Sequence, residues 1–205
     1  MINNEDVIAL KIDEYISNDE KIQLYTYATN FVLNNKHYYA RQKGTTNEKI
    51  IKAYRWYISE LIFQKFIYIN NLNINNNIIF DWLSNNFTRK SDVCDVYING
   101  LSIDIKSSYE KIKFKDADFH KHIDFFLNQR NYTLPVDQSN NKKDLIMQIM
   151  YNHENTYIYI IWYIYSNDLI KKWKIINLKV SWDWIQPTYM YKLKNWNPIY
   201  YLFNQ

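Results

Sequence analysis

A two-residue turn constrains the middle of this chain more tightly than any other feature of its sequence. Asn99 and Gly100 lie between two short runs rich in β-branched residues, Val93–Ile98 and Leu101–Ser107. Both turn residues tolerate the positive φ that a type I′ hairpin turn requires. The pattern therefore predicts an antiparallel hairpin in which Ile98 faces Leu101, and this pairing sets the register of both strands.

The predicted register places two carboxylates on one face of the hairpin. Asp95 is expected directly across from Asp104, with Cβ atoms roughly 4.5–5.5 Å apart. Lys106 points the same way, because side chains alternate along a strand. The other face is apolar throughout: Cys94, Val96, Ile98, Ile103 and Ile105. Like charges repel at this distance, so the hairpin predicts a cation on one face and a packed core on the other.

Two carboxylates and the nearby backbone carbonyl of Ile105 are hard oxygen ligands of the kind that Mg²⁺, or Mn²⁺, prefers. Such a cation polarises a phosphodiester and acidifies water, and the ammonium of Lys106 can orient that water or stabilise developing charge. The residues therefore indicate phosphodiester hydrolysis. The alternative is a solvated strand face on which Asp95, Asp104 and Lys106 form an ordinary cross-strand ion pair.

Asp95 followed by Asp104-Ile105-Lys106 resembles the bipartite signature of the PD-(D/E)XK nucleases, the restriction-endonuclease-like superfamily, although no proline precedes Asp95. That family commonly carries a glutamate on a helix before the first strand. Ser59–Ile67 resembles this helix, with Glu60 as the candidate and Glu48 as the second choice. Lys143–Ile149 resembles the next core strand, in which Gln148 can face the site as an accessory residue.

This resemblance implies an α/β fold with a restriction-endonuclease-like core, in which helices flank a mixed β-sheet. It implies that Glu60, Asp95, Asp104 and Lys106 are catalytic, and that Asp95, Asp104, the Ile105 carbonyl and Glu60 hold the metal. The expected function is a metal-dependent DNA endonuclease, of restriction type or encoded by a mobile element or phage. Two alternatives stay open: a catalytically inactive nuclease fold that binds DNA or a protein, and a small interaction protein.

The composition excludes several other classes of protein. Two glycines and three prolines among 205 residues are too few for the Gly-rich loops of dinucleotide-binding and P-loop proteins. A single cysteine excludes an intramolecular disulfide framework and a multi-cysteine zinc site. No apolar run approaches the roughly 20 residues of a membrane span, and the acidic N-terminus is not a signal peptide. We expect a protein that is not secreted and works in the cytoplasm or wherever its DNA resides.

The net charge of +4 permits nucleic-acid binding without demanding it. Lys111, Lys113 and Arg55 are candidates for contacts with DNA phosphates, and a solvated basic face explains them equally well. Double-strand cleavage needs two sites, which a homodimer would supply. The aromatic-rich tail is a candidate surface for such pairing or for reading duplex DNA.

The chain is expected to form one domain, with a helical N-terminal segment at 1–43, a core at 44–165 and an aromatic-rich part at 166–205. Strands are expected at Asp144–Tyr151 and Thr156–Tyr165, and short strands and turns after them. A first helix is expected over Val7–Ile16. A second is expected to follow an N-cap at Ser17 or Asn18, and its apolar stripe is Ile22, Tyr25, Ala28, Thr29 and Val32. A third is expected from a cap at Thr45 or Thr46 to about Asn70.

Overall fold

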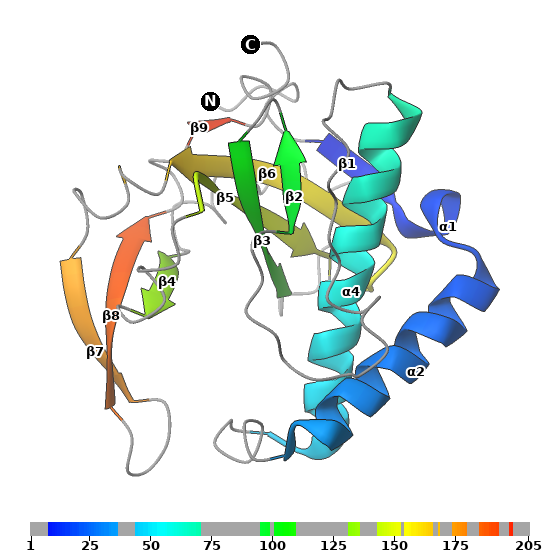
Figure 1. Cartoon of the computed structure of the whole chain (residues 1–205), viewed down its shortest axis with the longest axis horizontal. Coiled ribbons are helices and arrows are strands. Elements are labelled where there is room, and N and C mark those ends of the chain that lie inside the picture. Colours follow the sequence, from blue (N-terminus) through cyan, green and yellow to red (C-terminus); the bar gives the residue numbers. More distant parts are fainter. Residues whose placement is uncertain are drawn as a thin grey trace.

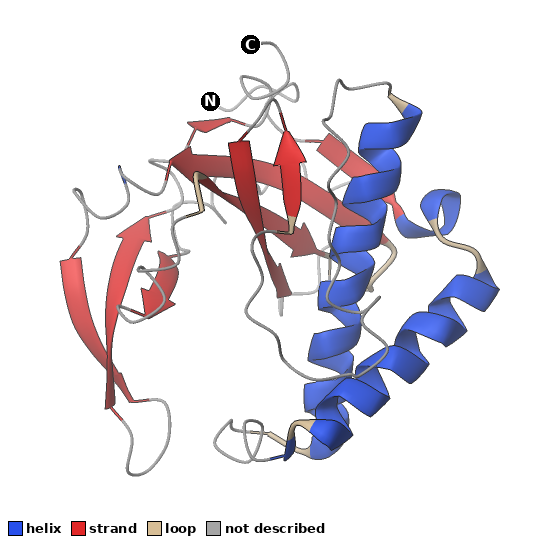
Figure 2. Cartoon of the chain, in the orientation of Figure 1, coloured by secondary structure: helices blue, strands red, loops and turns tan. Residues whose placement is uncertain are grey.

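A computed structural model of the chain describes residues 8–36, 44–70, 95–98, 101–109, 131–135, 143–152, 154–165, 168, 174–179, 185–192 and 197–198. These residues form a mixed α/β structure (Figures 1 and 2). The helices gather on one side of a larger sheet, and a smaller sheet lies on the side away from them. The expected α/β class is therefore confirmed.

The larger sheet is mixed, and its order is β1-β6-β5-β3-β2, with β9 added to β6. β3 and β5 run parallel, whereas every other neighbouring pair is antiparallel. The two long strands expected in the second half of the chain are confirmed as β5 and β6. The strands are β1 (Ile8–Lys11), β2 (Val96–Ile98), β3 (Leu101–Tyr109), β5 (Leu145–Tyr151), β6 (Tyr157–Tyr165) and β9 (Asn197–Pro198).

The hairpin formed by β2 and β3 has the register that the turn residues predict. Val96 pairs with Ile103, and Ile98 pairs with Leu101. Val96, Ile103 and Ile105 are at most 2% exposed, so the expected apolar face does pack into the core. The turn residues Asn99 and Gly100 lie outside the described residues, and so does Cys94.

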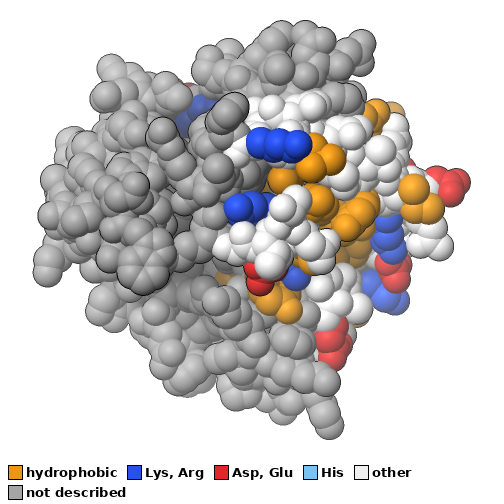
Figure 3. Space-filling model, turned by 90° about the horizontal axis from the view of Figure 1, so that it is seen from below, with side chains coloured by type: hydrophobic (Ala, Val, Ile, Leu, Met, Phe, Trp, Pro, Cys, Tyr) orange, Lys and Arg blue, Asp and Glu red, His pale blue; other side chains and the backbone are white. Residues whose placement is uncertain are grey.

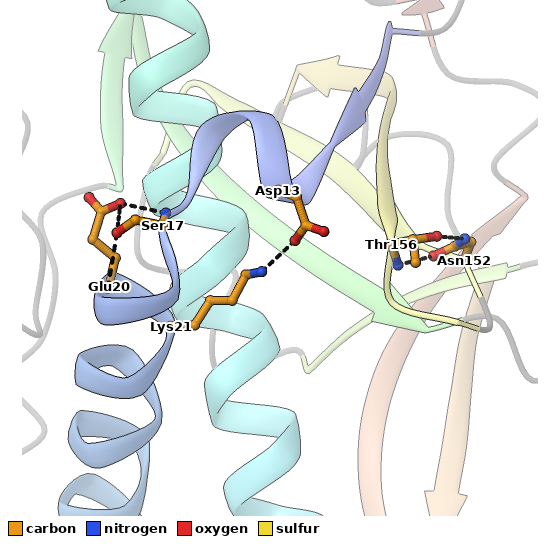
Figure 4. Close-up of polar contacts among 6 residues, drawn as sticks. All are labelled: Asp13, Ser17, Glu20, Lys21, Asn152 and Thr156. Carbon is orange, nitrogen blue, oxygen red and sulfur yellow. Dashed lines mark hydrogen bonds and ion pairs between the residues drawn. The ribbon is translucent and has the colours of Figure 1, made fainter.

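Capping boxes start both long helices. In α2 (Asn18–Asn34) the N-cap is Ser17, whose hydroxyl accepts the Glu20 N–H while the Glu20 carboxylate accepts the Ser17 N–H (Figure 4). Thr45 and Glu48 repeat this arrangement at α4 (Thr46–Ile69). A Ser or Thr three residues before a Glu is the sequence signature of this cap. Of the two candidates at each helix start, the structure selects Ser17 and Thr45.

The two helices bury different proportions of their surface. α2 buries Leu24, Ala28, Phe31 and Val32. Its expected apolar stripe is therefore wrong at Ile22 and Tyr25, which are 67% and 42% exposed. α4 is buried around most of its middle, because it lies between α2 and the larger sheet. The Lys65 ammonium links α4 to the two preceding helical segments. It lies 2.8 Å from the carbonyl oxygen of Tyr15, the last residue of the helical turn Ile12–Tyr15, and 2.6 Å from the carboxylate of Glu20 in α2.

The first described residues differ from the expected helix. Ile8–Lys11 form the edge strand β1, which pairs with β6 by placing Leu10 opposite Ile158, and only the single turn α1 (Ile12–Tyr15) is helical. An isolated short helix is costly to nucleate, whereas a sheet edge offers ready hydrogen-bond partners. An ion pair between Asp13 and Lys21 then links α1 to α2 (Figure 4). The N-terminal segment is therefore only partly helical, and it adds a strand to the central sheet.

The smaller sheet combines part of the expected core with the tail. It is antiparallel in the order β4-β8-β7, with β4 at Asn131–Pro135, β8 at Ile185–Lys192 and β7 at Lys174–Lys179. The short strands expected in the tail are thus confirmed at β7, β8 and β9. None of the described helices combines the length and the apolar character that a membrane crossing needs.

Figure 3 views the molecule from below and shows a band of hydrophobic side chains with charged side chains of both signs around it. The large apolar side chains exposed on the two long helices are Ile22, Tyr25, Leu33, Tyr68 and Ile69. On the face shown, the described surface therefore mixes apolar side chains with charged side chains of both signs.

Candidate functional site

Asp95 closes the open end of the hairpin, directly before β2. Its N–H donates to the carbonyl of Ile103 at 3.0 Å, although Ile103 is already the register partner of Val96. Its Oδ2 accepts the N–H of Ile105. The backbone pairing between the two strands of the hairpin thus slips by one residue at Asp95. The Asp95 carboxylate, in place of a backbone carbonyl, then accepts the next N–H of β3, that of Ile105. Asp95 is 5% exposed and therefore largely shielded from water.

Asp104 and Lys106 lie on the polar face of β3, opposite the face formed by Ile103 and Ile105. The Lys106 Nζ lies 2.6 Å from Asp104 Oδ2. The Asp104 side chain is 15% exposed and that of Lys106 is 37% exposed. The expected alternation along β3 is therefore present, and it creates a charged pair that solvent can reach.

The two aspartates interact electrostatically across the end of the hairpin. Burial raises the pKa of Asp95 to about 7, and the negative charge of Asp104 adds to the rise. The charges of Lys106 and Lys143 and the hydrogen bond from Ile105 act in the opposite direction. Such a shift is typical of carboxylates that share a poorly solvated site. The repulsion between Asp95 and Asp104 that the sequence predicts is thus a feature of this structure.

The backbone adds a third oxygen to this edge of the sheet. The N–H and carbonyl of one strand residue point toward the same neighbouring strand. Because the Ile105 N–H points to Asp95, the Ile105 carbonyl points to that side as well, beyond the end of β2 at Val96. Two carboxylates and one carbonyl form a donor set suited to a hard divalent cation. Among the described residues, no group of three or more His, Cys, Asp or Glu side chains is placed to hold a metal ion.

Glu60 is not brought together with the two aspartates. It lies in α4 with 2% exposure, and α4 covers the apolar face of the sheet. Burial raises the pKa of the nearby Tyr151 hydroxyl, and the charge of Glu60 contributes to that rise. The same hydroxyl bonds to Ser59 Oγ at 3.1 Å and to the Arg55 carbonyl. Glu60 therefore belongs to a polar cluster on the α4 side, while Asp104 and Lys106 occupy the opposite face.

Gln148 lies beside the strand segment that carries Lys106. The two residues are register partners, and Gln148 Nε2 donates to the Lys106 carbonyl at 3.0 Å and to Ser108 Oγ at 3.1 Å. It also donates to the Ile149 carbonyl at 2.8 Å, where the pairing of β5 with β6 shifts register. Gln148 is 4% exposed. Its contacts are with the backbone and hydroxyl of β3, and its accessory role stays a prediction.

The three candidates for phosphate contacts separate into two groups. Arg55 packs its guanidinium 3.7 Å from the ring centroid of Tyr109, and its Nε donates to Asn155 Oδ1 at 2.9 Å. Lys111 and Lys113 lie outside the described residues. The guanidinium of Arg55 is therefore held by contacts within the fold.

Sequence reasoning missed two residues at the start of β5. Asp144 Oδ2 accepts the Ser102 N–H at 2.9 Å and the Ser102 hydroxyl at 2.7 Å. In return, the Asp144 N–H donates to the Ser102 carbonyl at 3.0 Å and to its Oγ at 2.9 Å. Lys143, whose charge lowers the pKa of Asp95, directly precedes Asp144. The sequence signal that could have indicated these residues is the charged pair Lys143-Asp144 directly before β5, a strand that is buried throughout.

Comparisons with protein-family models, with curated proteins and with solved structures found no match to this chain. The geometry of the site and the resemblance of its motif therefore provide the basis for a functional proposal.

Proposed function

We propose that this chain is a metal-dependent endonuclease that hydrolyses phosphodiester bonds in duplex DNA. One observation carries the proposal. Asp95 is a buried carboxylate whose charge is opposed by the charge of Asp104, and a lysine contacts Asp104 directly. A fold gains nothing from such repulsion, whereas a site that binds a cation needs it.

The arrangement of the strands supports a restriction-endonuclease-like core. The hairpin with the two aspartates is followed by a strand parallel to β3 and then by an antiparallel strand, β6. α4 covers one face of this sheet. The strand, turn, strand layout of the motif and a mixed sheet next to a helix agree with the family that the residues resemble.

The donor set fits Mg²⁺ or Mn²⁺, which would be held by Asp95, Asp104 and the Ile105 carbonyl. A cation of this kind supplies Lewis-acid polarisation of a phosphate and lowers the pKa of water. A bound cation would offset both causes that raise the pKa of Asp95, which are burial and then the negative charge of Asp104.

Lys106 has a distinct role in the proposed reaction. Once the charge of Asp104 is neutralised, the Lys106 ammonium can leave the ion pair and stabilise the negative charge that develops on the phosphate oxygens. A water oxygen bonds to phosphorus as one P–O ester bond breaks. The proton from the water passes through solvent to the leaving oxygen, so the products are a phosphomonoester and an alcohol.

One site of this type cuts one strand at a time. Cleavage of both strands then requires a homodimer or two successive nicks. We include the homodimer in the proposal as the source of the second site.

The number of carboxylates at the site favours a second candidate function. Only Asp95 and Asp104 converge among the described residues, and Glu60 lies on the other face of the sheet. A nuclease fold without a third carboxylate can retain binding and lack cleavage. The second candidate is therefore a catalytically inactive nuclease-fold protein that binds DNA or a protein partner.

Nicking of supercoiled plasmid in Mg²⁺ tests the proposal and separates the two candidates. Asp104→Asn is expected to abolish nicking. Asp13→Asn is the matched control, because Asp13 also forms an ion pair with a lysine but lies in α1, which directly follows the edge strand β1 on the far side of the sheet from β2. Equal nicking by both variants would contradict the site. DNA binding in Ca²⁺ without any nicking in Mg²⁺ would support the inactive candidate.

A further inference from the structure

The outer side of α2 carries a regularly spaced row of side chains. α2 packs against α4, and α4 lies between it and the larger sheet, so the far side of α2 faces outward (Figure 1). Residues at alternating intervals of three and four form the row, which is the spacing of a helix that packs along a second helix. All of them are exposed except Thr29, which is half-buried. We call this row the α2 seam: Asp19, Ile22, Thr26, Thr29, Leu33 and Lys36.

The two large aliphatic side chains of the seam are exposed. Ile22 is 67% exposed and Leu33 is 42% exposed, and about three helical turns separate them. Neither packs against the core of the described residues. A second apolar surface laid along α2 would remove both from water, and this burial is the main favourable contribution that the seam can make to association.

The middle of the seam is suited to close contact. Thr26 Oγ1 donates to the Ile22 carbonyl at 3.0 Å, and Thr29 Oγ1 donates to the Tyr25 carbonyl at 2.9 Å. Both hydroxyl protons are used within the helix, so burial of these side chains leaves no hydroxyl donor unsatisfied. A second helix can therefore cover the threonines at little cost.

The charges at the two ends of the seam are opposite in sign. Asp19 lies in the first turn of α2, and Lys36 directly follows the C-cap Asn35. A parallel pair of α2 helices would place like charges side by side at both ends. An antiparallel pair places Asp19 of each copy next to Lys36 of the other, so the charges favour the antiparallel arrangement.

An antiparallel pair also matches every other position of the seam. A two-fold axis between Thr26 and Thr29 makes the contact self-complementary, because each pairing is repeated with the two copies exchanged. The threonines meet at the centre, the aliphatic residues lie next to them, and the charges lie at the rim, which is the usual anatomy of an interface. The spacing pairs the residues as follows: Asp19 with Lys36, Ile22 with Leu33, and Thr26 with Thr29.

We propose that the α2 seam is a docking surface for a second copy of this chain, and that two copies pair through antiparallel α2 helices. The contact is independent of the chemistry of the site, but its purpose, the supply of a second cleavage site, rests on the proposed function. α2 has 17 residues and is about 26 Å long. A pair of such helices buries less than the roughly 1,200–2,000 Å² of stable complexes, so the dimer is expected to dissociate on dilution.

Sedimentation of the full chain, from about 1 to about 500 μM, tests the aliphatic layer. Ile22→Gln is expected to raise the Kd of the dimer on the order of 30-fold, because two isoleucines per dimer lose their contact. Ile69→Gln is the matched control, since Ile69 is 61% exposed at the end of α4 and lies outside the seam. The control should leave the Kd within about twofold.

Charge reversal tests the antiparallel arrangement. Asp19→Lys alone, or Lys36→Asp alone, replaces two attractive pairs by two repulsive ones and should raise the Kd about tenfold. An equal mixture of the two variants should regain the affinity of the unmodified chain, because every end pair in the mixed dimer is again opposite in sign. Recovery also shows that both variants are folded. Lys52→Glu, an exposed reversal on α4, is the control and should change nothing.

The outcomes separate the inference from the proposed function. A chain that nicks plasmid but stays monomeric throughout the series, or whose Ile22→Gln variant pairs like Ile69→Gln, overturns the inference alone. Failure of the mixed charge variants to recover overturns the antiparallel contact and with it the inference. A chain that pairs through the seam without nicking keeps the inference and overturns the endonuclease.

Discussion

The larger sheet and its covering helix α4 hold two buried acidic residues, Asp95 and Glu60, that sit in different surroundings. On the α4 face, Glu60 is 2% exposed and its charge acts on the Tyr151 hydroxyl, which bonds to Ser59 Oγ and to the Arg55 carbonyl. At the open end of the β2–β3 hairpin, burial raises the pKa of Asp95 and the charge of Asp104 adds to the rise. Glu60 lies beside a hydrogen-bonded hydroxyl group, whereas Asp95 lies beside a second carboxylate. The comparison teaches that burial alone does not identify a functional carboxylate.

The largest expected effect is on cleavage. Asp104→Asn should reduce Mg²⁺-dependent nicking on the order of 100-fold or more, because it removes a proposed metal ligand and the ion-pair partner of Lys106. Glu60→Gln is the equivalent change on the α4 face and should leave the nicking rate within about threefold. Initial rates on supercoiled plasmid measure both. A loss of nicking in Glu60→Gln as large as that in Asp104→Asn would contradict the distinction between the two acids and would identify Glu60 as a catalytic residue.

The second effect is on the dependence of stability on pH. The folded chain keeps a proton on Asp95 up to about pH 7, whereas the ordinary pKa of an unfolded Asp is 3.8. The folded state therefore binds more protons between these values, and the free energy of unfolding falls as pH rises from about 4 to 7. At about 1.4 kcal/mol per pH unit, the total loss is about 4 kcal/mol at most.

Asp95→Asn isolates this contribution. The amide oxygen can still accept the Ile105 N–H, but the group no longer ionises. The variant should be more stable than the unmodified chain at pH 8 and should lose the decline between pH 4 and 7. Urea denaturation at several pH values measures the difference. A variant with an unchanged pH profile would show that Asp95 titrates in the folded state as it does in the unfolded chain.

The smallest expected effect lies on the α4 face. Tyr151→Phe removes the hydroxyl that bonds to Ser59 Oγ and the Arg55 carbonyl, and it should lower stability by about 1 kcal/mol. Nicking should be unchanged, since no reacting group is touched. Chemical denaturation measures the change in stability, and the plasmid assay measures nicking. Loss of nicking in a stably folded Tyr151→Phe variant would show that the Tyr151 hydroxyl affects the site formed by Asp95 and Asp104.

Local patterns predict much of this structure. Ser17 with Glu20, and Thr45 with Glu48, mark the helix starts because a capping box is complete within four residues. The hairpin register follows from two turn residues and the alternation beside them. Each of these features depends on contacts between residues that are near in the sequence.

The remaining features depend on contacts between distant residues. β1 is a strand only because β6 offers it an edge, and four residues do not show a period. The clamp between Ser102 and Asp144 exists only once β3 and β5 pair in parallel. Glu60 could not be assigned to a face, because α4 is apolar around most of its circumference.

The central claim is that Asp95 and Asp104 together bind one divalent cation. Calorimetric titration of the chain with Mn²⁺ at pH 7 tests it most directly. We predict one site per chain, with uptake accompanied by partial proton release from Asp95, absent in Asp104→Asn and retained in Glu60→Gln. Equal binding by the chain and by Asp104→Asn, or no binding by the unmodified chain, would contradict the account.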